Sequence, residues 1–425
     1  MRRRTLLRLA ASAFAAPTAV FAQTPAPPPG VDAPAPVSAP RPSDLLGASG
    51  EGYFIDWLND FYARALGSGV SRSLLDQALS GLSPDPRVMA HDTAQPEFAR
   101  PAGEYIRASV TAGRIAQGRT LRDSIPQFTA IETTYGCPRD VLLGVWAMES
   151  NFGRTQGDMD VVRSLATLAA LGRRRPWAEG ELLAALQILA SGKAPGARLM
   201  GSWAGAMGQT QMVPTAYLAD GVDEDGDGRV DIWSSASDAL ASAANLLAKA
   251  GWRRGEGWAR EVRLSPGFDV SLVEGPQETP DWWTQKGAHR ADGLAWSGAD
   301  LTATCVLLLP SGARGPAFLA LPNHFVIRKY NNSLAYALAV GLLADGFAGG
   351  PPLATPWPPE TPLSLDDRLA AQGALQRLGY DPGPLDGVIG ARARAALRAW
   401  QKAQGLTADG YLTPELIARL KAATA

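Results

Sequence analysis

The sequence predicts a mainly helical protein in which a long body is followed by a small helical tail. Apolar residues recur at helical spacing in four stretches of the body, which are 141–149, 181–190, 237–249 and 333–344. Strand-like runs are few, and the clearest are 303–309 and Phe325-Val326-Ile327. Because 425 residues exceed the usual size of one core, we expect more than one domain.

Two Pro-rich stretches mark the predicted domain boundaries. Residues 23–43 are typical of a Pro/Ala-rich tether, and residues 349–363 of a Pro-rich linker. They bound a body at 44–348 and a tail at 364–425. We expect these two segments to fold as separate domains.

The first 22 residues are expected to be a signal peptide. Three arginines at positions 2–4 precede an apolar run from 9 to 22, and Val-Phe-Ala at 20–22 fits a cleavage site. Residues 3–7 also resemble a twin-arginine signal, so ordinary secretion and export in the folded state both stay open. The rest of the chain has no stretch of the roughly 18 apolar residues that a membrane span needs. We expect a periplasmic protein without a membrane span.

Composition argues against several classes of partner. The 40 basic and 41 acidic residues give a net charge of -1, which does not favour nucleic acid. Two cysteines, Cys137 and Cys305, form neither a disulfide framework nor a zinc-ligand pattern, and whether they pair stays open. We expect a monomer with no organic cofactor.

Glu149 is the candidate catalytic acid. A helix that begins at Pro138 places Leu142, Val145 and Trp146 on the same face as Glu149. Desolvation on this apolar face predicts a raised pKa for the carboxyl, which suits a general acid. The alternative is a glutamate that points to water at a fraying helix end, and periodicity alone slightly favours that alternative.

Two further segments carry residues that suit sugar binding. Residues 201–214 interleave Gly and Ala with polar side chains, which lets backbones approach closely. Residues 328–336 carry tyrosines and amides at close spacing, which suits stacking and hydrogen bonding to sugar rings. Taken singly, the first segment also fits tight helix–loop packing, and the second an ordinary helix start.

Taken together, these segments resemble the lytic murein transglycosylase B family. The specific motifs are Met-Glu-Ser-Asn-Phe-Gly at 148–153 and Gly-Ala-Met-Gly-Gln at 205–209. The resemblance runs from about residue 95 to the helix after Tyr336. It implies a lysozyme-like α+β catalytic domain with Glu149 as the sole catalytic acid and base.

The resemblance also implies which residues contact the substrate. The positions that match the sugar contacts of the family are Ser202, Gln211, Tyr330, Asn331 and Tyr336. Arg173 and Arg174 match a basic pair that lines the groove, although a solvated charge cluster is the alternative. Where relatives carry Tyr and Gly before the groove glutamine, this chain has Gln209 and Thr210.

The implied reaction is cleavage of the β-1,4 bond between N-acetylmuramic acid and N-acetylglucosamine in peptidoglycan, with formation of a 1,6-anhydro sugar. Glycan strands of peptidoglycan are therefore the expected partner, and other wall-remodelling proteins are candidate partners. A hydrolytic muramidase, a non-catalytic wall-binding scaffold and a calcium-regulated binding protein are the alternatives.

An acidic loop that starts at Asp223 is a candidate calcium site. It has oxygen ligands at positions 1, 3 and 5 of the EF-hand pattern and Gly at position 6, but Ser234 stands where a glutamate usually closes the loop. The resembling family has a lengthened loop closed by a later Asp. The candidate ligands are Asp223, Asp225, Asp227, the backbone carbonyl of Arg229, and Asp238. Because clustered carboxylates repel each other, we expect a structural Ca²⁺; a solvated Asp-Gly turn is the alternative.

The tail carries three predicted short helices, at about 365–378, at about 391–404 and after Thr413, with the turns Asp386-Gly387 and Asp409-Gly410 between them. Together with Leu378-Gly379-Tyr380 and Ala399-Trp400-Gln401, this pattern resembles the small helical peptidoglycan-binding domain. Relatives usually have Thr where this chain has Ala393. A wall-binding domain on a tether would raise the local concentration of wall near the catalytic cleft. A structural or protein-docking module is the alternative.

Overall fold

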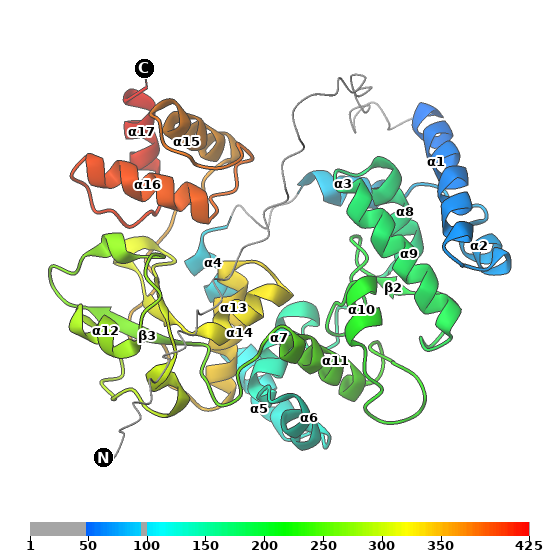
Figure 1. The fold of residues 1–425 in the computed structure, drawn as a ribbon, viewed down its shortest axis with the longest axis horizontal. Coiled ribbons are helices and arrows are strands. Elements are labelled where there is room, and N and C mark those ends of the chain that lie inside the picture. Colours follow the sequence, from blue (N-terminus) through cyan, green and yellow to red (C-terminus); the bar gives the residue numbers. More distant parts are fainter. Residues whose placement is uncertain (1–47, 95–99, 425) are drawn as a thin grey trace, which may run out of the picture. The chain divides into compact units, whose positions relative to one another are not determined.

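The computed structural model describes residues 48–94 and 100–424 (Figure 1). The predicted signal peptide and the Pro/Ala-rich tether lie outside the described residues. Helices dominate the described chain, which confirms the mainly helical prediction. Of these helices, none combines the length and the apolar composition that spanning a lipid bilayer requires.

Ten of the described α-helices precede the acidic loop. Their bounds are α1 Ala48–Gly67, α2 Arg72–Leu79, α3 Pro86–Ala94, α4 Ala102–Ser109, α5 Ala112–Arg122, α6 Phe128–Tyr135, α7 Arg139–Ser150, α8 Val161–Leu171, α9 Arg175–Ser191 and α10 Pro214–Asp220. The later helices are α11 Ala236–Lys249, α12 Pro280–Gln285, α13 Pro322–Tyr330, α14 Leu334–Phe347, α15 Leu365–Arg377, α16 Ala391–Ala403 and α17 Pro414–Ala422.

Strands form two small antiparallel sheets. The strands are β1 Met159–Asp160, β2 Met200–Gly201, β3 Ala259–Leu264, β4 Ala288–Arg290, β5 Val306–Leu308 and β6 Ala317–Ala320. β1 pairs with β2, and the other four strands follow the order β4-β3-β6-β5. Only β5 lies within a run that the sequence analysis singled out, because strands this short carry little periodic signal.

The predicted strand-like run Phe325-Val326-Ile327 is wrong, because these residues lie in α13. Pro322 occupies the first turn of this helix, where its missing N–H costs no hydrogen bond. Val326 and Ile327 are buried while Phe325 is exposed, as a helical face requires. Three consecutive apolar residues cannot distinguish a strand from a buried helix, so the local pattern was ambiguous.

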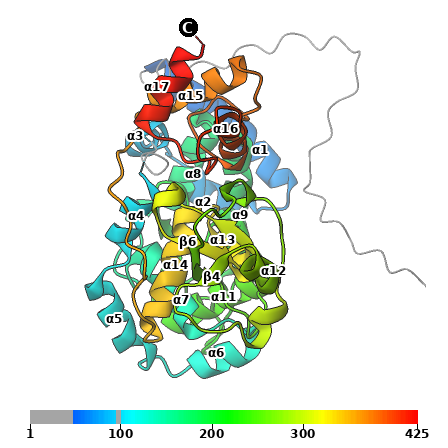
Figure 2. The ribbon, with the colours of Figure 1, turned by 90° about the vertical axis from the view of Figure 1, so that its left-hand side faces the viewer.

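Two helix pairs organise the body. α7 packs against α14, and their side chains belong to one hydrophobic core with α11. α8 packs against α9 in a second core that also takes in α1 and α2. α7 and α14, which lie side by side in Figure 2, carry Glu149 and Tyr336.

The two cysteines are free and buried in different cores. Cys137 belongs to the core around α7 and α14, and Cys305 to the core beneath the four-stranded sheet. Burial raises the pKa of both thiols. They therefore pack as small apolar side chains.

The tail is a three-helix unit, as predicted (Figure 1). Thr413 caps α17 by accepting a hydrogen bond from the backbone N–H of Leu416. A buried glutamine locks each Asp-Gly turn. Gln372 accepts from the N–H of Gly387, and Gln401 accepts from the N–H of Gly410, both at 2.8 Å. These glutamines explain how so small a core holds two turns in place.

The Pro-rich linker is held along the body by hydrogen bonds and aromatic packing. The carboxylate of Glu261 accepts hydrogen bonds from the N–H groups of Ala354 and Thr355, each at 2.8 Å. The indole of Trp357 stacks on Phe318, with ring centroids 6.2 Å apart. Aromatic packing and backbone hydrogen bonds thus offset the entropy that a free linker would keep.

Candidate active site

Glu149 lies in the last turn of α7, half-buried beside the core. Leu142, Val145 and Trp146 are buried, and Trp146 packs edge-on against Phe152. The apolar face predicted for this helix is therefore present. The carboxylate stands where this face meets the surface.

The chain leaves α7 through three successive left-handed residues. Asn151, Phe152 and Gly153 have φ values of 50°, 59° and 80°. Such conformations are costly for residues with a Cβ and persist where surrounding contacts enforce them. At Gly153 a Cβ would lie 2.6 Å from Oε1 of Gln209, so any other residue would displace the Gln209 amide and would also strain the backbone. This turn brings the end of α7 against residues 205–212.

Gln209 connects the two sequence motifs. Its side-chain oxygen accepts a hydrogen bond from the indole N–H of Trp146 at 3.1 Å. Its backbone carbonyl accepts a short hydrogen bond from the hydroxyl of Ser150. The same hydroxyl accepts a hydrogen bond from the backbone N–H of Gly153 at 2.8 Å. Ser150 follows Glu149 directly, so these contacts fix the helix end that carries the carboxylate.

Two tyrosines complete the surroundings of Glu149. The hydroxyl of Tyr336, on α14, donates a hydrogen bond to Oε1 of Glu149 at 2.5 Å. The hydroxyl of Tyr330, at the end of α13, donates to the carbonyl of Thr210 at 2.5 Å. Burial, and then the charge of Glu149, raise the pKa of both phenols well above the usual value. Both tyrosines therefore stay protonated as hydrogen-bond donors.

The segment at 201–214 is a tight loop. Met207 and Met212 exchange two backbone hydrogen bonds, at 2.9 and 3.0 Å. Gln211, with φ of 50°, donates its amide to the carbonyls of Gln156 and Gly208, each at 2.9 Å. These hydrogen bonds keep the predicted sugar-contact residue Gln211 against the loop.

Of the other predicted sugar contacts, Ser202 lies at the start of the same loop and Asn331 at the end of α13. The hydroxyl of Ser202 accepts a hydrogen bond from the N–H of Ala206 at 3.1 Å. Asn331 is exposed directly after Tyr330. Both are half-exposed or exposed, as a groove wall requires.

Arg173 and Arg174 lie between α8 and α9, where they make structural contacts. The buried carboxylate of Asp92, on α3, accepts from the backbone and the side chain of Arg173. The guanidinium of Arg174 lies 4.4 Å from the ring centre of Trp177. His91, which directly precedes Asp92, stacks on Trp203 of the 201–214 loop. α3 thus connects the basic pair to that loop.

No local pattern in the sequence predicts the contacts that Trp146 and Ser150 make, and Gln209 and Thr210 differ from relatives in sequence without indicating a role. In the structure these four residues hold Glu149 and Tyr330 in place. The sequence shows that these four residues lie in or next to the motifs, but it does not show which of them contact each other in the folded protein.

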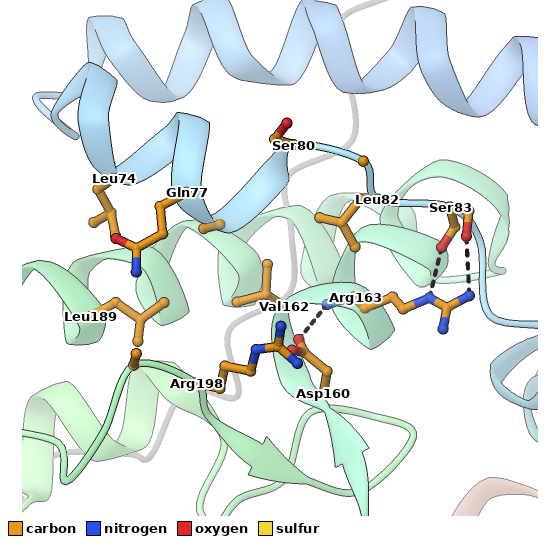
Figure 3. A pocket seen from close by; sticks show the side chains of 13 residues that line it. Leu74, Gln77, Ser80, Leu82, Ser83, Asp160, Val162, Arg163, Leu189 and Arg198 are labelled. Carbon is orange, nitrogen blue, oxygen red and sulfur yellow. Dashed lines mark hydrogen bonds between the residues drawn. The ribbon is translucent and has the colours of Figure 1, made fainter.

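A separate cavity of about 450 Å³ lies between α2, β1 and the end of α9 (Figure 3). Arg163 borders it and donates to the carbonyl of Ser83 at 2.8 Å. Arg198 points into it beside Asp160 (Figure 3). Its lining includes neither Glu149 nor the tyrosines, so it is distinct from the candidate site.

The acidic loop brings together Asp223, Asp225 and Asp227, whose carboxylate oxygens lie within 4.8 Å of one another. Asp223 accepts from the N–H groups of Gly226 and Gly228, at 2.7 and 2.8 Å. This all-oxygen donor set fits a hard cation such as Ca²⁺.

Asp238 differs from the other predicted ligands. Its fully buried carboxylate accepts from the N–H groups of Glu224 and Asp231, at 3.0 and 2.9 Å. It therefore closes the loop through backbone hydrogen bonds, and the carboxylate cluster consists of the other three aspartates. Arg229 is exposed within the loop.

Comparisons with known proteins agree with this geometry. Residues 53–345 match the family described as "Transglycosylase SLT domain", and residues 364–420 match "Putative peptidoglycan binding domain". The membrane-bound lytic murein transglycosylase B of Escherichia coli is 30% identical over 224 residues, which cover 50% of this chain and 58% of that protein. The match thus spans less than two thirds of that relative.

Solved structures extend the likeness. SltB3 from Pseudomonas aeruginosa, in complex with NAG-anhNAM-pentapeptide, is 45% identical with a TM-score of 0.82, covering 87% of this chain and 99% of that chain. The Escherichia coli lytic transglycosylase Slt35 in complex with calcium is 26% identical with a TM-score of 0.57, covering 68% and 92%. The chain therefore belongs to the transglycosylase SLT family of lytic murein transglycosylases, with a peptidoglycan-binding type of domain at its C-terminus.

Proposed function

We propose that this protein cleaves the β-1,4 bond between N-acetylmuramic acid and N-acetylglucosamine in peptidoglycan and forms a 1,6-anhydromuramic product. The observation that carries the proposal is the half-buried Glu149, which accepts a hydrogen bond from Tyr336 at the end of an apolar helix. SltB3, 45% identical, was crystallised with NAG-anhNAM-pentapeptide, which supports the assignment of product.

Glu149 acts first as an acid and then as a base. Its carboxyl proton passes to the glycosidic oxygen, and the bond from that oxygen to C1 of the muramyl residue breaks. The 6-hydroxyl of the same sugar then attacks C1, and its proton returns to Glu149. One proton leaves and one returns, so the reaction consumes no water.

The tyrosines support this cycle. After the proton has left, the hydroxyl of Tyr336 stabilises the carboxylate form of Glu149 by a charge-assisted hydrogen bond. Ordinary glycosidases use a pair of carboxylates, of which one serves as nucleophile or as base for water. Here a phenol contacts the acid, and the substrate's own hydroxyl supplies the nucleophile.

The substrate is positioned by the groove residues. We assign the sugar contacts to Tyr330 and Tyr336 beside Glu149, to Ser202 and Gln211 on the loop, to Asn331, and to Arg173 and Arg174 near α3. Arg173 contacts Asp92, and Trp203 stacks on His91. Because Asp92 and His91 are neighbours on α3, these contacts support a common groove wall.

The acidic loop is proposed to bind a structural Ca²⁺. Asp223, Asp225, Asp227 and the carbonyl of Arg229 would hold the ion, and Asp238 would brace the loop from within. The ion would neutralise the carboxylates and stiffen an EF-hand-like loop that follows the groove wall. Slt35, 26% identical, was crystallised with calcium, which supports this proposal.

We also propose the domain arrangement and the location. A catalytic domain at 44–348, a linker at 349–363 and a wall-binding domain at 364–425 account for the two family matches. The enzyme would act on the wall in the periplasm after removal of residues 1–22. The tail would keep the catalytic domain at the glycan strands.

The decisive experiment is mass spectrometry of the muropeptides that the protein releases from purified peptidoglycan. We expect 1,6-anhydromuramyl products from the wild type and none from Glu149→Gln, which should still sediment with insoluble wall. Glu179→Gln, a distant glutamate on α9, is the control and should retain activity. Reducing-end products would instead indicate a hydrolytic muramidase, and the absence of products from the wild type would indicate a binding scaffold.

A further inference from the structure

A crevice of about 230 Å³ separates the tail domain from the catalytic domain. Its walls come from both domains. The catalytic domain contributes Arg100, Pro101, Ala102, Tyr105, Val273, Glu274, Leu309, Pro310 and residues 333–335; the tail and linker contribute Thr361, Leu363, Arg368, Val388, Ile389, Arg394 and residues 409–412. The charged members are three arginines (Arg100, Arg368 and Arg394) and two carboxylates (Glu274 and Asp409), so the crevice carries a net positive charge. This crevice is distinct from the contacts of Glu149, and the family matches assign no role to it.

The crevice is lined by residues next to the catalytic site in the sequence. Residues 333–335, which line it, directly precede Tyr336, the residue that contacts Glu149. Tyr105, also in the lining, is close enough to Tyr336 to contribute to the raised pKa of that phenol. The crevice wall therefore includes the turn of chain that leads directly into α14 and its catalytic tyrosine.

The tail is fixed on the catalytic domain by a buried ion cluster. Arg394 donates two hydrogen bonds to one oxygen and one to the other oxygen of Glu274, and Arg398 donates a further one at 2.8 Å. Although burial by itself would raise it, the two guanidinium groups hold the pKa of Glu274 below its usual value. Asp409 also accepts from the N–H of Ala313 at 3.0 Å. The crevice is thus a built feature of the fold.

The chemistry of the walls suits a short peptide. The sides are mostly aliphatic or aromatic, which fits small apolar side chains. The guanidinium of Arg368, which donates to the carbonyls of Gly387 and Leu363, provides positive charge at the tail side. Val388, 38% exposed, stands at the crevice as an accessible apolar side chain. A chain with methyl side groups and free carboxylates complements these walls.

We propose that this crevice binds the peptide stem attached to the muramic acid residue that lies at Glu149. The inference rests on the proposed function. A stem of five residues extends at most ~17 Å. Residues 333–335 line the crevice and directly precede Tyr336, so they offer such a chain a path from the catalytic residues to the tail. The tail would then select strands that carry their peptides, in addition to holding the enzyme on the wall.

The test compares two substrates and two variants. The substrates are glycan strands with their peptide stems and the same strands after an amidase has removed the stems. Val388→Asp places a negative charge in the crevice, where it repels the carboxylates of the stem. Leu385→Asp is the matched control, because Leu385 is 47% exposed on the same loop but is absent from the crevice lining.

We expect Val388→Asp to lower kcat/KM on peptide-bearing strands on the order of tenfold and to leave the stripped strands unchanged. Leu385→Asp should change neither. An equal loss on both substrates would overturn the proposal, because the crevice would then contact glycan or support the fold. No loss on either substrate would overturn it as well.

A binding measurement separates this inference from the proposed function. Calorimetric titration with the free stem pentapeptide should show binding to the wild type and to Leu385→Asp, and weaker binding to Val388→Asp. This result does not depend on turnover, so it would stand even if the wild type cleaved no glycan. Equal binding to all three proteins, or to none, would overturn the crevice as the stem site.

Discussion

The hydroxyl of Tyr336 lies 2.5 Å from Oε1 of Glu149, across 187 positions of sequence, and donates a hydrogen bond to it. This contact couples α14 to the end of α7. Loss of the Tyr336 hydroxyl should therefore directly change how well Glu149 gives up and takes back its proton.

Tyr336→Phe removes this donor and keeps the ring. A hydrogen bond to a charged group contributes about 1.5–3 kcal/mol, so kcat should fall by about one to two orders of magnitude. KM should change little, because the ring still fills its buried position. Steady-state kinetics on purified glycan strands measure both. A KM increase with unchanged kcat would mean that Tyr336 serves binding only.

Gly153→Ala should damage the site through strain and a clash. Its φ of 80° disfavours alanine, and the new Cβ would lie 2.6 Å from Oε1 of Gln209. We expect a loss of stability of about 1–3 kcal/mol together with a loss of activity, because the shifted Gln209 anchors the end of α7. Gly192→Ala is the control: φ is 66°, but nothing lies within 4 Å of the added Cβ. If thermal denaturation shows equal losses for both variants, the clash with Gln209 plays no part.

Asp345→Asn should stabilise the protein at neutral pH. Burial raises the pKa of this carboxyl from 3.8 to about 6, although the indole N–H of Trp258 donates to it at 3.1 Å. The folded state therefore binds its proton more tightly than the unfolded state, and stability falls as pH rises from about 4 to 6. Above that range the ionised carboxyl costs ~2–3 kcal/mol, which asparagine avoids while keeping an acceptor for Trp258.

The check is the difference in unfolding free energy between Asp345→Asn and the wild type from pH 4 to pH 7.5. It should grow through pH 4–6 and then stay constant. His324 acts in the opposite direction, since burial lowers its pKa to about 3 and stability falls as pH drops below 6.5. That contribution is common to both proteins and cancels. A difference independent of pH would contradict the assignment to Asp345.

Removal of calcium should lower the melting temperature of the wild type. The carboxylates of Asp223, Asp225 and Asp227 lie within 4.8 Å of one another and repel without a cation. Adding a chelator should therefore destabilise the wild type, and Asp225→Ala should abolish this response. Asp158→Ala, whose carboxylate is 89% exposed outside the loop, should respond like the wild type. A wild-type melting temperature that does not change with chelator would mean that the loop is an ordinary Asp-Gly turn.

Local sequence patterns were enough to predict the helices that carry the site and the tail. α7 and α14 are apolar and buried along most of their length, and Thr413 with Pro414 marks the start of α17. The pattern failed at Phe325-Val326-Ile327, where three apolar residues fit a strand and a helix equally, and the packing of α13 against α14 decided the outcome.

Short-range spacing and turn residues specify the motif that contains Glu149, the acidic loop and the three helices of the tail, so these features could be predicted from the sequence. The packing of the helices was needed to show that Tyr336 contacts Glu149, that Gln209 connects the two motifs, and that Glu274 binds the tail through Arg394. These pairs lie 187, 59 and 120 positions apart. Contacts at such separations leave no local periodicity, since they exist only once the helices have packed.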